Sequence, residues 1–521
     1  MERRVFLAIA LCVGIFALWQ HFVIKPYVDT QEAYRAQTQK AQPVAPAVSV
    51  VESKVNARAV TASSERLKTA AMALRIPFEG RAFSAALSTA GGTIEQSKIH
   101  VFQGKQAGNA DQLIASQRQL MLSSNTPGLE GLSEVVYSVA ERTSERVILE
   151  YVDKGISLRR TYTFSPDRYS FAHRLEAKMP AAALGQFLFL GMRAKKDVEK
   201  TENERRTLAV HKGGATDFTE ISSVSERKED PAQVDWLGFS SRYFLNAIVA
   251  GPVNGAETPR LLAQPQGVDE VEALLAYKIT SDKLSIENTL YFGPKDIEVL
   301  RANDAKLATA VDFGWFTFFA YPLLQGLKWF YKYVHNFGIA IILLTILVKL
   351  LTYPLTYKSM KSMKDMQRIQ PQLQKLRERF ADDKEGLNRE MLQLMRANGY
   401  NPLSGCLPMI VQMPIFIALY NVLYNSIELY KQPFFGWIAD LSQKDPYFVT
   451  PVLLAGVMFI QQKMTPNTAA DPAQQRMMTF MPIIFGAMML WLPSGLTLYM
   501  LVNSIVSIAQ QLAINKAISR A

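Results

Sequence analysis

Residues 337–357 (FGIAIILLTILVKLLTYPLTY) form an apolar run long enough to cross a bilayer, whose hydrocarbon core of about 30 Å needs roughly 20 helical residues. The run carries one cation, Lys349, and a basic stretch with Lys358, Lys361 and Lys364 follows it directly. A charge inside a span costs about 2.5–3.5 kcal/mol on insertion scales, so it needs a functional reason or a route to water. The run indicates a membrane protein and marks Lys349 as a candidate functional residue.

Two interpretations of Lys349 stay open. It lies about five residues from Pro354, roughly 7 Å along a helix, so its ammonium could snorkel to the membrane surface. Alternatively, it faces a wet cavity inside a helix bundle, where water solvates it. An internal salt bridge is not expected, because the only acid close to the other apolar runs is Glu428, near the opposite end of its run.

Five further apolar runs raise the expected number of spans to six: residues 5–24, 405–424, 447–464, 477–492 and 496–514. Lys and Arg are retained on the cytoplasmic side of a membrane. Arg3 and Arg4 precede the first run, and residues 358–398 hold ten Lys or Arg against six acids. The first run lacks a small-x-small cleavage pattern, so we expect an uncleaved anchor (residues 1–28) and both termini in the cytoplasm.

Residues 83–292 contain short β-prone segments separated by turn signals such as Gly91-Gly92 and Ser165-Pro166-Asp167. The clearest segments are residues 134–140, 146–153, 156–164, 169–176 and 284–292. Many short, partly alternating strands favour an antiparallel β-sandwich, here on the far side of the membrane. We predict this domain over residues 63–310, joined to the anchor by a flexible linker at residues 29–62.

The sandwich shows no pattern typical of an enzyme. His100, His173 and His211 lack metal-ligand spacing, and no nucleophile elbow, H-E-x-x-H or Walker loop is present. Cys12 lies in one apolar run and Cys406 begins another, so neither suggests a disulfide or metal cluster. We therefore expect no catalytic residue, no cofactor and no metal.

Two elements are predicted next to the second span. Residues 295–309 read as a short helix, and residues 311–336 as an amphipathic, aromatic helix on the outer membrane surface, with Lys328 and Lys332 on one face. Residues 358–400 predict a cytoplasmic hairpin of two amphipathic helices, with apolar residues repeating every three or four positions on either side of residues 382–386. Its basic charge and few aromatics favour generic phosphate attraction, as to a ribosome, and no specific nucleic-acid sequence.

Polar and methionine side chains carry the functional argument. Polar groups recur at helical spacing within the spans: Tyr499 and Asn503, then Ser507 and Gln510, with Thr345 and Gln412 elsewhere. They either bond between helices or face water. Fifteen of the twenty methionines lie between residues 360 and 500, and flexible methionine suits a surface for varied apolar partners. Those expected to capture incoming chains at the hairpin are Met360, Met363, Met366, Met391 and Met395.

Several Pro and Gly placements resemble the YidC/Oxa/Alb family of membrane protein insertases, in its Gram-negative form. They are Asn401-Pro402-Leu403-Ser404-Gly405-Cys406-Leu407-Pro408, Gln412-Met413-Pro414-Ile415-Phe416, Phe480-Met481-Pro482 and Leu492-Pro493-Ser494-Gly495-Leu496. The resemblance covers nearly the whole chain. It implies a polytopic α-helical membrane protein with six spans and a large periplasmic antiparallel β-sandwich. The five-helix insertase core would comprise residues 337–357, the hairpin and residues 401–521.

The resemblance implies a non-enzymatic chaperone in the inner membrane that inserts hydrophobic segments of nascent membrane proteins, alone or with the Sec translocon. Its partners would be nascent chains, the ribosome, the Sec translocon and the lipid bilayer. A hydrophilic groove would carry a cation at Lys349, where the family pattern has arginine. The same matching assigns groove or sliding-path roles to Thr345, Gln412, Met413, Pro414, Trp491, Tyr499 and Asn503. Met500 follows Tyr499 where the family pattern has a second tyrosine.

Two rival classes make different predictions. A small-solute transporter would show internal repeats and paired discontinuous helices, and neither is visible in the sequence. A membrane-anchored carbohydrate enzyme would need carboxylate or histidine clusters in residues 83–292. The sandwich resembles the family's sugar-binding-like fold, and a fold alone implies no sugar.

Overall fold

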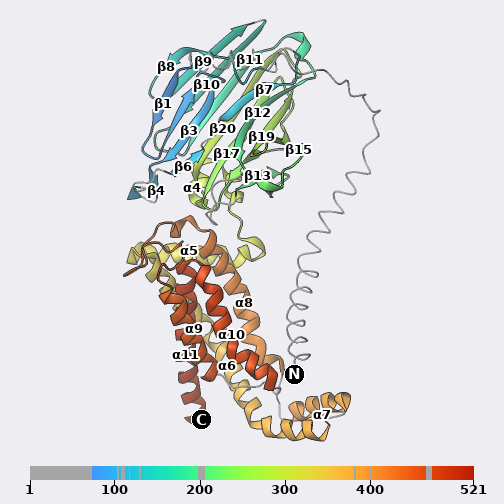
Figure 1. Ribbon diagram of the computed structural model, residues 1–521, viewed down its shortest axis with the longest axis vertical. Helices are drawn as coiled ribbons and strands as arrows, with labels where there is room; N and C mark the ends of the chain where they lie inside the picture. The colour runs from blue at the N-terminus through green and yellow to red at the C-terminus, as the bar shows by residue number, and fades with distance from the viewer. Residues whose placement is uncertain are drawn as a thin grey trace.

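The computed structural model describes residues 73–520 apart from 103–104, 107–111, 116–117, 128, 130, 154, 197–205, 381–382, 398–401 and 465–471. The predicted anchor and linker lie outside the described residues. A β-sandwich occupies one end of the molecule and a bundle of helices the other (Figure 1). Helix α5 lies at the end of the bundle that faces the sandwich (Figure 1).

Within the described residues, two nine-stranded antiparallel sheets form the sandwich. The first sheet contains β1 (Arg75–Glu79), β2 (Phe83–Ser88), β3 (Thr93–Ile99), β6 (Gln112–Ala115), β7 (Gln119–Ser124), β12 (Phe187–Lys195), β15 (Lys228–Gln233), β18 (Arg260–Gln266) and β19 (Glu270–Lys278). The second contains β8 (Ser138–Arg142), β9 (Arg146–Asp153), β10 (Ile156–Phe164), β11 (Ser170–Lys178), β13 (Thr207–Lys212), β14 (Ala215–Glu220), β16 (Trp236–Ser240), β17 (Phe244–Asn254) and β20 (Lys283–Pro294). A small ribbon pairs β4 (Val101–Phe102) with β5 (Lys105–Gln106). The predicted fold class is confirmed for the sandwich.

Side-chain alternation explains why the strand predictions worked. In β10 every second side chain is buried, and those between are exposed or half-buried, as a sheet with one covered face requires. The predicted bounds of β9 and β10 coincide with the observed ones. The segment predicted at residues 134–140 overlaps a strand only in part, because residues 131–134 form a turn and the strand runs over Ser138–Arg142.

One inward position of β10 holds a fully buried cation, Arg160. Its Nη1 donates to the carbonyl of Gly91 at 2.6 Å, and its Nη2 donates to the carbonyl of Leu120 at 2.8 Å. Its Nε donates to Nε2 of His173 at 3.1 Å. Burial, and then the guanidinium itself, hold the pKa of His173 well below its usual range, so this ring accepts as the neutral form. Arg160 of the second sheet thus bonds backbone carbonyls on the side of the first sheet and links the two sheets.

Replacing Arg160 tests this cross-link. Arg160→Ala leaves two buried carbonyls unsatisfied and opens a cavity, so we expect the sandwich to lose about 2–5 kcal/mol of stability. The matched control is Arg159→Ala, an exposed neighbour on the opposite face, which should cost no more than about 1 kcal/mol. Urea unfolding of the full chain in detergent, read by pulse proteolysis, measures both. Equal losses would contradict the cross-link.

The connector between the sandwich and the bundle is divided into several short helical pieces. Residues 295–309 were predicted as one helix, and the structure has α4 (Ile297–Asn303) and then the 3-10 turn η4 (Ala305–Ala310). Asp296 caps α4, and extended Asp304 ends that helix and caps η4. A second 3-10 turn, η5 (Gly314–Phe316), leads into α5 (Thr317–Val334).

Helix α5 is amphipathic, as predicted. Ala320, Leu324 and Leu327 are buried against the bundle, whereas Phe318 and Trp329 are exposed. The predicted polar face of Lys328 and Lys332 differs from the observed one, because the side chain of Lys328 is 19% exposed and held by carboxylates.

Five further helices of the described residues complete the bundle: α6 (Phe337–Arg379), α8 (Pro402–Asn425), α9 (Val449–Met464), α10 (Pro472–Met488) and α11 (Ser494–Arg520). Within the part of the chain that the structure describes, two segments are long and apolar enough to span a membrane by themselves, Phe337–Ser362 and Ser494–Ile518. At 1.5 Å per residue α9 extends about 24 Å and α10 about 26 Å, less than a bilayer core of about 30 Å.

The hairpin differs from its prediction in one respect. Its first helix is the uninterrupted continuation of α6 through Pro354 and Pro371, and its second is α7 (Lys384–Ala397). Ile369 and Leu373 of α6 are buried against α7, which gives the pair a small apolar core. The hairpin and the C-terminal end of α11 lie at the end of the bundle away from the sandwich (Figure 1).

Close packing at the start of α6 depends on Gly338. A Cβ there would lie 2.0 Å from the ring of Phe434, so we expect Gly338→Ala to lower stability by about 1–3 kcal/mol despite alanine's better helix propensity. A Cβ added to Gly456 in α9 would have no atom within 4 Å, so Gly456→Ala should be neutral or stabilising. Thermal unfolding in detergent compares them, and similar midpoints would contradict this packing.

Candidate functional site

Lys349 lies inside the bundle, 9% exposed, between α6 and α11. Its Nζ donates to Oγ of Ser507 at 2.8 Å. Ser507 in turn donates to the carbonyl of Asn503 at 2.7 Å, and Gln510 donates to the carbonyl of Lys349 at 2.9 Å. Because the ammonium is directed at α11, this geometry favours the interior interpretation of Lys349 over snorkelling.

The charge of Lys349 has no acidic partner among the described side chains: its ammonium donates to the hydroxyl of Ser507, and the amide of Gln510 bonds only the backbone carbonyl of Lys349. Within the same described set, Oε1 of Gln510 is buried and accepts no hydrogen bond. The site therefore keeps a positive charge and a spare acceptor in a largely apolar bundle. Such a site attracts a negative charge and bonds a polar donor.

Polar side chains on α11 contact two other helices. Tyr499, Asn503 and Ser507 are spaced four residues apart and so share a face of α11. The buried Tyr499 hydroxyl accepts from Nε2 of Gln412 on α8 at 3.4 Å. Thr345, also buried, lies one turn from Lys349 and donates to the carbonyl of Ile341 in its own helix at 2.7 Å. Residues of α6, α8 and α11 thus form one polar row.

The other predicted site residues are apolar and differ in exposure. Met413 on α8 is 46% exposed and Trp491 in η7 (Met489–Trp491) is 66% exposed, and Pro414 is half-buried. Met413 and Trp491 are thus exposed at the surface of the bundle.

The five hairpin methionines are not equivalent. Met391 packs against the small core that joins α6 and α7, so it stabilises the hairpin itself. Met360 is half-buried on α6. Met363 and Met366 belong to α6 and Met395 to α7, and their side chains lie outside the described set.

Sequence reasoning missed a charged site where the sandwich meets the bundle. Nζ of Lys328 lies 3.3 Å from Asp296, 3.3 Å from Glu298 and 3.4 Å from Glu428, and we name these four residues the junction cluster. Glu428 is 3% exposed in the turn η6 (Ile427–Leu429) that follows α8. These partners are 30 to 100 residues from Lys328 in the chain, so no periodic pattern announced the cluster.

The two central charges of the junction cluster have shifted pKa values. Burial raises the pKa of Glu428 to about 7, although Lys328 opposes the change. Burial opposes the charge of Lys328, but Glu428, Asp296 and Glu298 outweigh it and raise its pKa. Lys328 therefore stays charged while Glu428 titrates near neutral pH.

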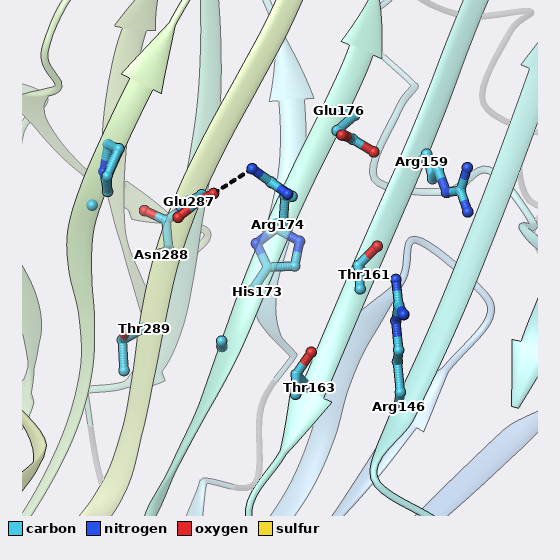
Figure 2. Close-up of a pocket in the computed structure, with 13 residues that line it drawn as sticks. Arg146, Arg159, Thr161, Thr163, His173, Arg174, Glu176, Glu287, Asn288 and Thr289 are labelled. Carbon is cyan, nitrogen blue, oxygen red and sulfur yellow. Dashed lines mark ion pairs between the residues drawn. The ribbon is translucent and has the colours of Figure 1, made fainter. Parts of the chain in front are cut away.

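A polar groove marks the outer face of the second sheet (Figure 2). It has a volume of about 600 Å³ and is lined by Arg146, Arg159, Thr161, Thr163, Ala172, His173, Arg174, Glu176, Gly251, Pro252, Glu287, Asn288 and Thr289. Figure 2 shows Arg174 directed at Glu287, and the two form an ion pair of 2.6 Å. The lining offers hydrogen bonds and no aromatic platform. Among the described residues, no group of three or more His, Cys, Asp or Glu is placed to hold a metal ion.

Comparison with known proteins places both parts of the chain. Residues 75–325 match the family described as YidC periplasmic domain, and residues 329–521 match the family described as 60Kd inner membrane protein. A relative from Geotalea daltonii, named membrane protein insertase YidC, is 34% identical over 99% of this chain and 100% of its own length. One of the same name from Geobacter metallireducens is 35% identical over 100% of this chain and 99% of its own.

The fold is also similar to a crystal structure of an active YidC insertase. The alignment covers 87% of this chain and 97% of the solved chain, with 18% identity and a TM-score of 0.37. The two full-length relatives exceed 30% identity from end to end. The two family matches meet inside α5, so the first covers the sandwich and the connector and the second covers the rest of the bundle. The chain therefore belongs to the YidC family of membrane protein insertases, non-enzymatic chaperones of the inner membrane with a periplasmic domain.

Proposed function

We propose that this insertase moves short hydrophilic tails of nascent inner-membrane proteins part of the way across the membrane through the polar row around Lys349. The observation that carries the proposal is a buried ammonium whose polar partners are neutral. A cation already neutralised by a carboxylate would attract an acidic tail only weakly. Lys349 keeps its attraction because Ser507 solvates the charge without cancelling it.

The free-energy balance of this mechanism needs no nucleotide. Taking a polar tail into hydrocarbon is costly, and polar groups on α6, α8 and α11 lower that cost by replacing some of its water. The apolar segment that follows the tail gains about 25 cal/mol for each Å² removed from water, and this gain drives its transfer into lipid. Exposed Met413 and Trp491 and half-buried Pro414 offer the segment an apolar path.

The helix lengths support the same mechanism. Helices α9 and α10 are both shorter than a bilayer core is thick, and short apolar helices thin the bilayer around them. A thinner bilayer shortens the distance that a tail has to cross.

We further propose the orientation and the partners of the chain. The basic hairpin and the end of α11 would face the cytoplasm, with the sandwich in the periplasm and the N-terminus in the cytoplasm. Met360, Met363, Met366 and Met395 would contact incoming chains from the ribosome, while Met391 holds the hairpin together. The insertase would act alone or with the Sec translocon. The support is the net positive charge of residues 358–398 and their place at the end of the bundle away from the sandwich (Figure 1).

Substitution of Lys349 tests the mechanism. In insertase-depleted cells, with equal expression verified, we expect Lys349→Arg to insert a single-span reporter with an acidic outer tail normally. Lys349→Ala and Lys349→Glu should reduce insertion at least about tenfold, since 1.4 kcal/mol of lost attraction corresponds to that factor. Equal insertion by the wild type and all three variants would show that Lys349 has no part in the mechanism.

A second substitution leaves the lysine in place and cancels its charge. Ser507→Asp supplies the carboxylate that the described site lacks, so we expect insertion of the acidic-tail reporter to fall as far as in Lys349→Ala. Ser507→Asn is the matched control, because a neutral amide of similar size should retain most insertion. The comparison is read with the same reporter. Undiminished insertion by Ser507→Asp would show that the charge of Lys349 does not act on the tail.

A further inference from the structure

The sandwich packs against the bundle through helix α4. Helix α4 has two covered faces: Ile297 packs in the apolar cluster of the bundle, together with Leu327 and Leu429, whereas Leu300 packs in a cluster of the sandwich around Trp236. A single short helix therefore belongs to both cores, and separating the two parts would expose Ile297.

Polar and aromatic contacts reinforce this junction from the sandwich side. Nε of Arg242 donates to the carbonyl of Tyr424 at 2.6 Å, and its guanidinium lies 3.6 Å from the centre of the Tyr424 ring. The ring of Tyr243 lies 4.8 Å from that of Tyr430. These contacts hold the outer end of α8, the helix that carries Gln412 in the polar row.

The junction cluster is the electrically unbalanced part of this interface. Three carboxylates surround one ammonium, so the cluster carries a formal charge of −2 when every group is ionised. Glu428 comes from the turn after α8, Lys328 from α5, and Asp296 and Glu298 from the start of α4. Behind Asp296 lie the phenols of Tyr169 and Tyr291, and they carry no positive charge to offset it. One bound proton lowers the imbalance to −1.

We propose that the junction cluster is a proton-dependent latch, in which a proton on Glu428 holds the periplasmic sandwich against the outer end of the bundle and loss of that proton loosens it. Glu428 is buried between the two parts, so its charge is tolerated better once they separate and water reaches it. The latch concerns docking of the two parts and stands independently of the role proposed for Lys349.

The direction of the pH effect follows from the shift of Glu428. Its pKa is raised from an ordinary 4.5 to about 7 in the docked state, so that state binds the proton more tightly than the separated state. The stabilisation of docking is complete below about pH 4.5 and is lost as the pH rises to about 7. Burial is the main cause of the raised pKa of Glu428, the negative charge of Asp296 adds to it, and Lys328 opposes it.

Thiol labelling measures the latch in the full chain. In protein with Cys12 and Cys406 replaced by serine, Ile297→Cys becomes reactive only when α4 leaves the bundle. Its rate with a dipyridyl disulfide is divided at each pH by the rate at the exposed control position Val268→Cys. We expect this ratio to rise about 10- to 100-fold from pH 5 to pH 8, because each unit of pKa shift is worth a factor of ten.

Two matched variants separate the latch from other causes. Adding Glu428→Gln, which resembles the protonated side chain, should make the ratio independent of pH, whereas Glu298→Gln, at a carboxylate that is 63% exposed, should leave most of the rise. Leu300→Cys should stay unreactive at both pH values, since α4 remains on the sandwich. The proposal is overturned by a ratio that is flat in the Ile297→Cys protein, by a rise that survives Glu428→Gln, or by equal labelling of Leu300→Cys.

Discussion

The cost of removing a positive charge from water shapes this chain in three places, and each place meets it differently. In the sandwich, the guanidinium of Arg160 is solvated by backbone carbonyls and a neutral histidine. At the junction, Lys328 is surrounded by an excess of carboxylates. In the bundle, the ammonium of Lys349 donates to the hydroxyl of Ser507. The partner decides what each charge can do: the first stabilises the fold, and in our proposals the second responds to protons and the third stays available to a visiting anion.

The availability of Lys349 depends on how α11 is built. This helix presents tyrosine, asparagine and serine four residues apart, so one face supplies neutral polar groups to both α6 and α8. Neutral dipoles stabilise a buried cation without forming the closed ion pair that would end its attraction for other charges. The same residues satisfy one another, as in Ser507 bonding to Asn503, and this keeps the polar row compatible with an apolar bundle.

The junction gives the periplasmic domain a mechanical connection to the membrane part. Helix α4 is packed on both sides, and Arg242 lies against the last turn of α8. A change in docking would therefore act on the same helix that carries Gln412. Helix α8 thus touches the sandwich at one end and contributes Gln412 to the polar row.

The sequence by itself determined the two architectures, because alternation in β10 and long apolar runs such as residues 337–357 are local consequences of where water is excluded. It also singled out Lys349, since a charge in such a run is conspicuous. Only the tertiary structure decided its partner, because Ser507 lies more than 150 residues away. The same holds for Glu428, which appeared to be an isolated acid at the end of a run and is in fact held by Lys328. Pairings between distant helices depend on how their faces rotate toward one another, and spacing along a single helix does not encode that rotation.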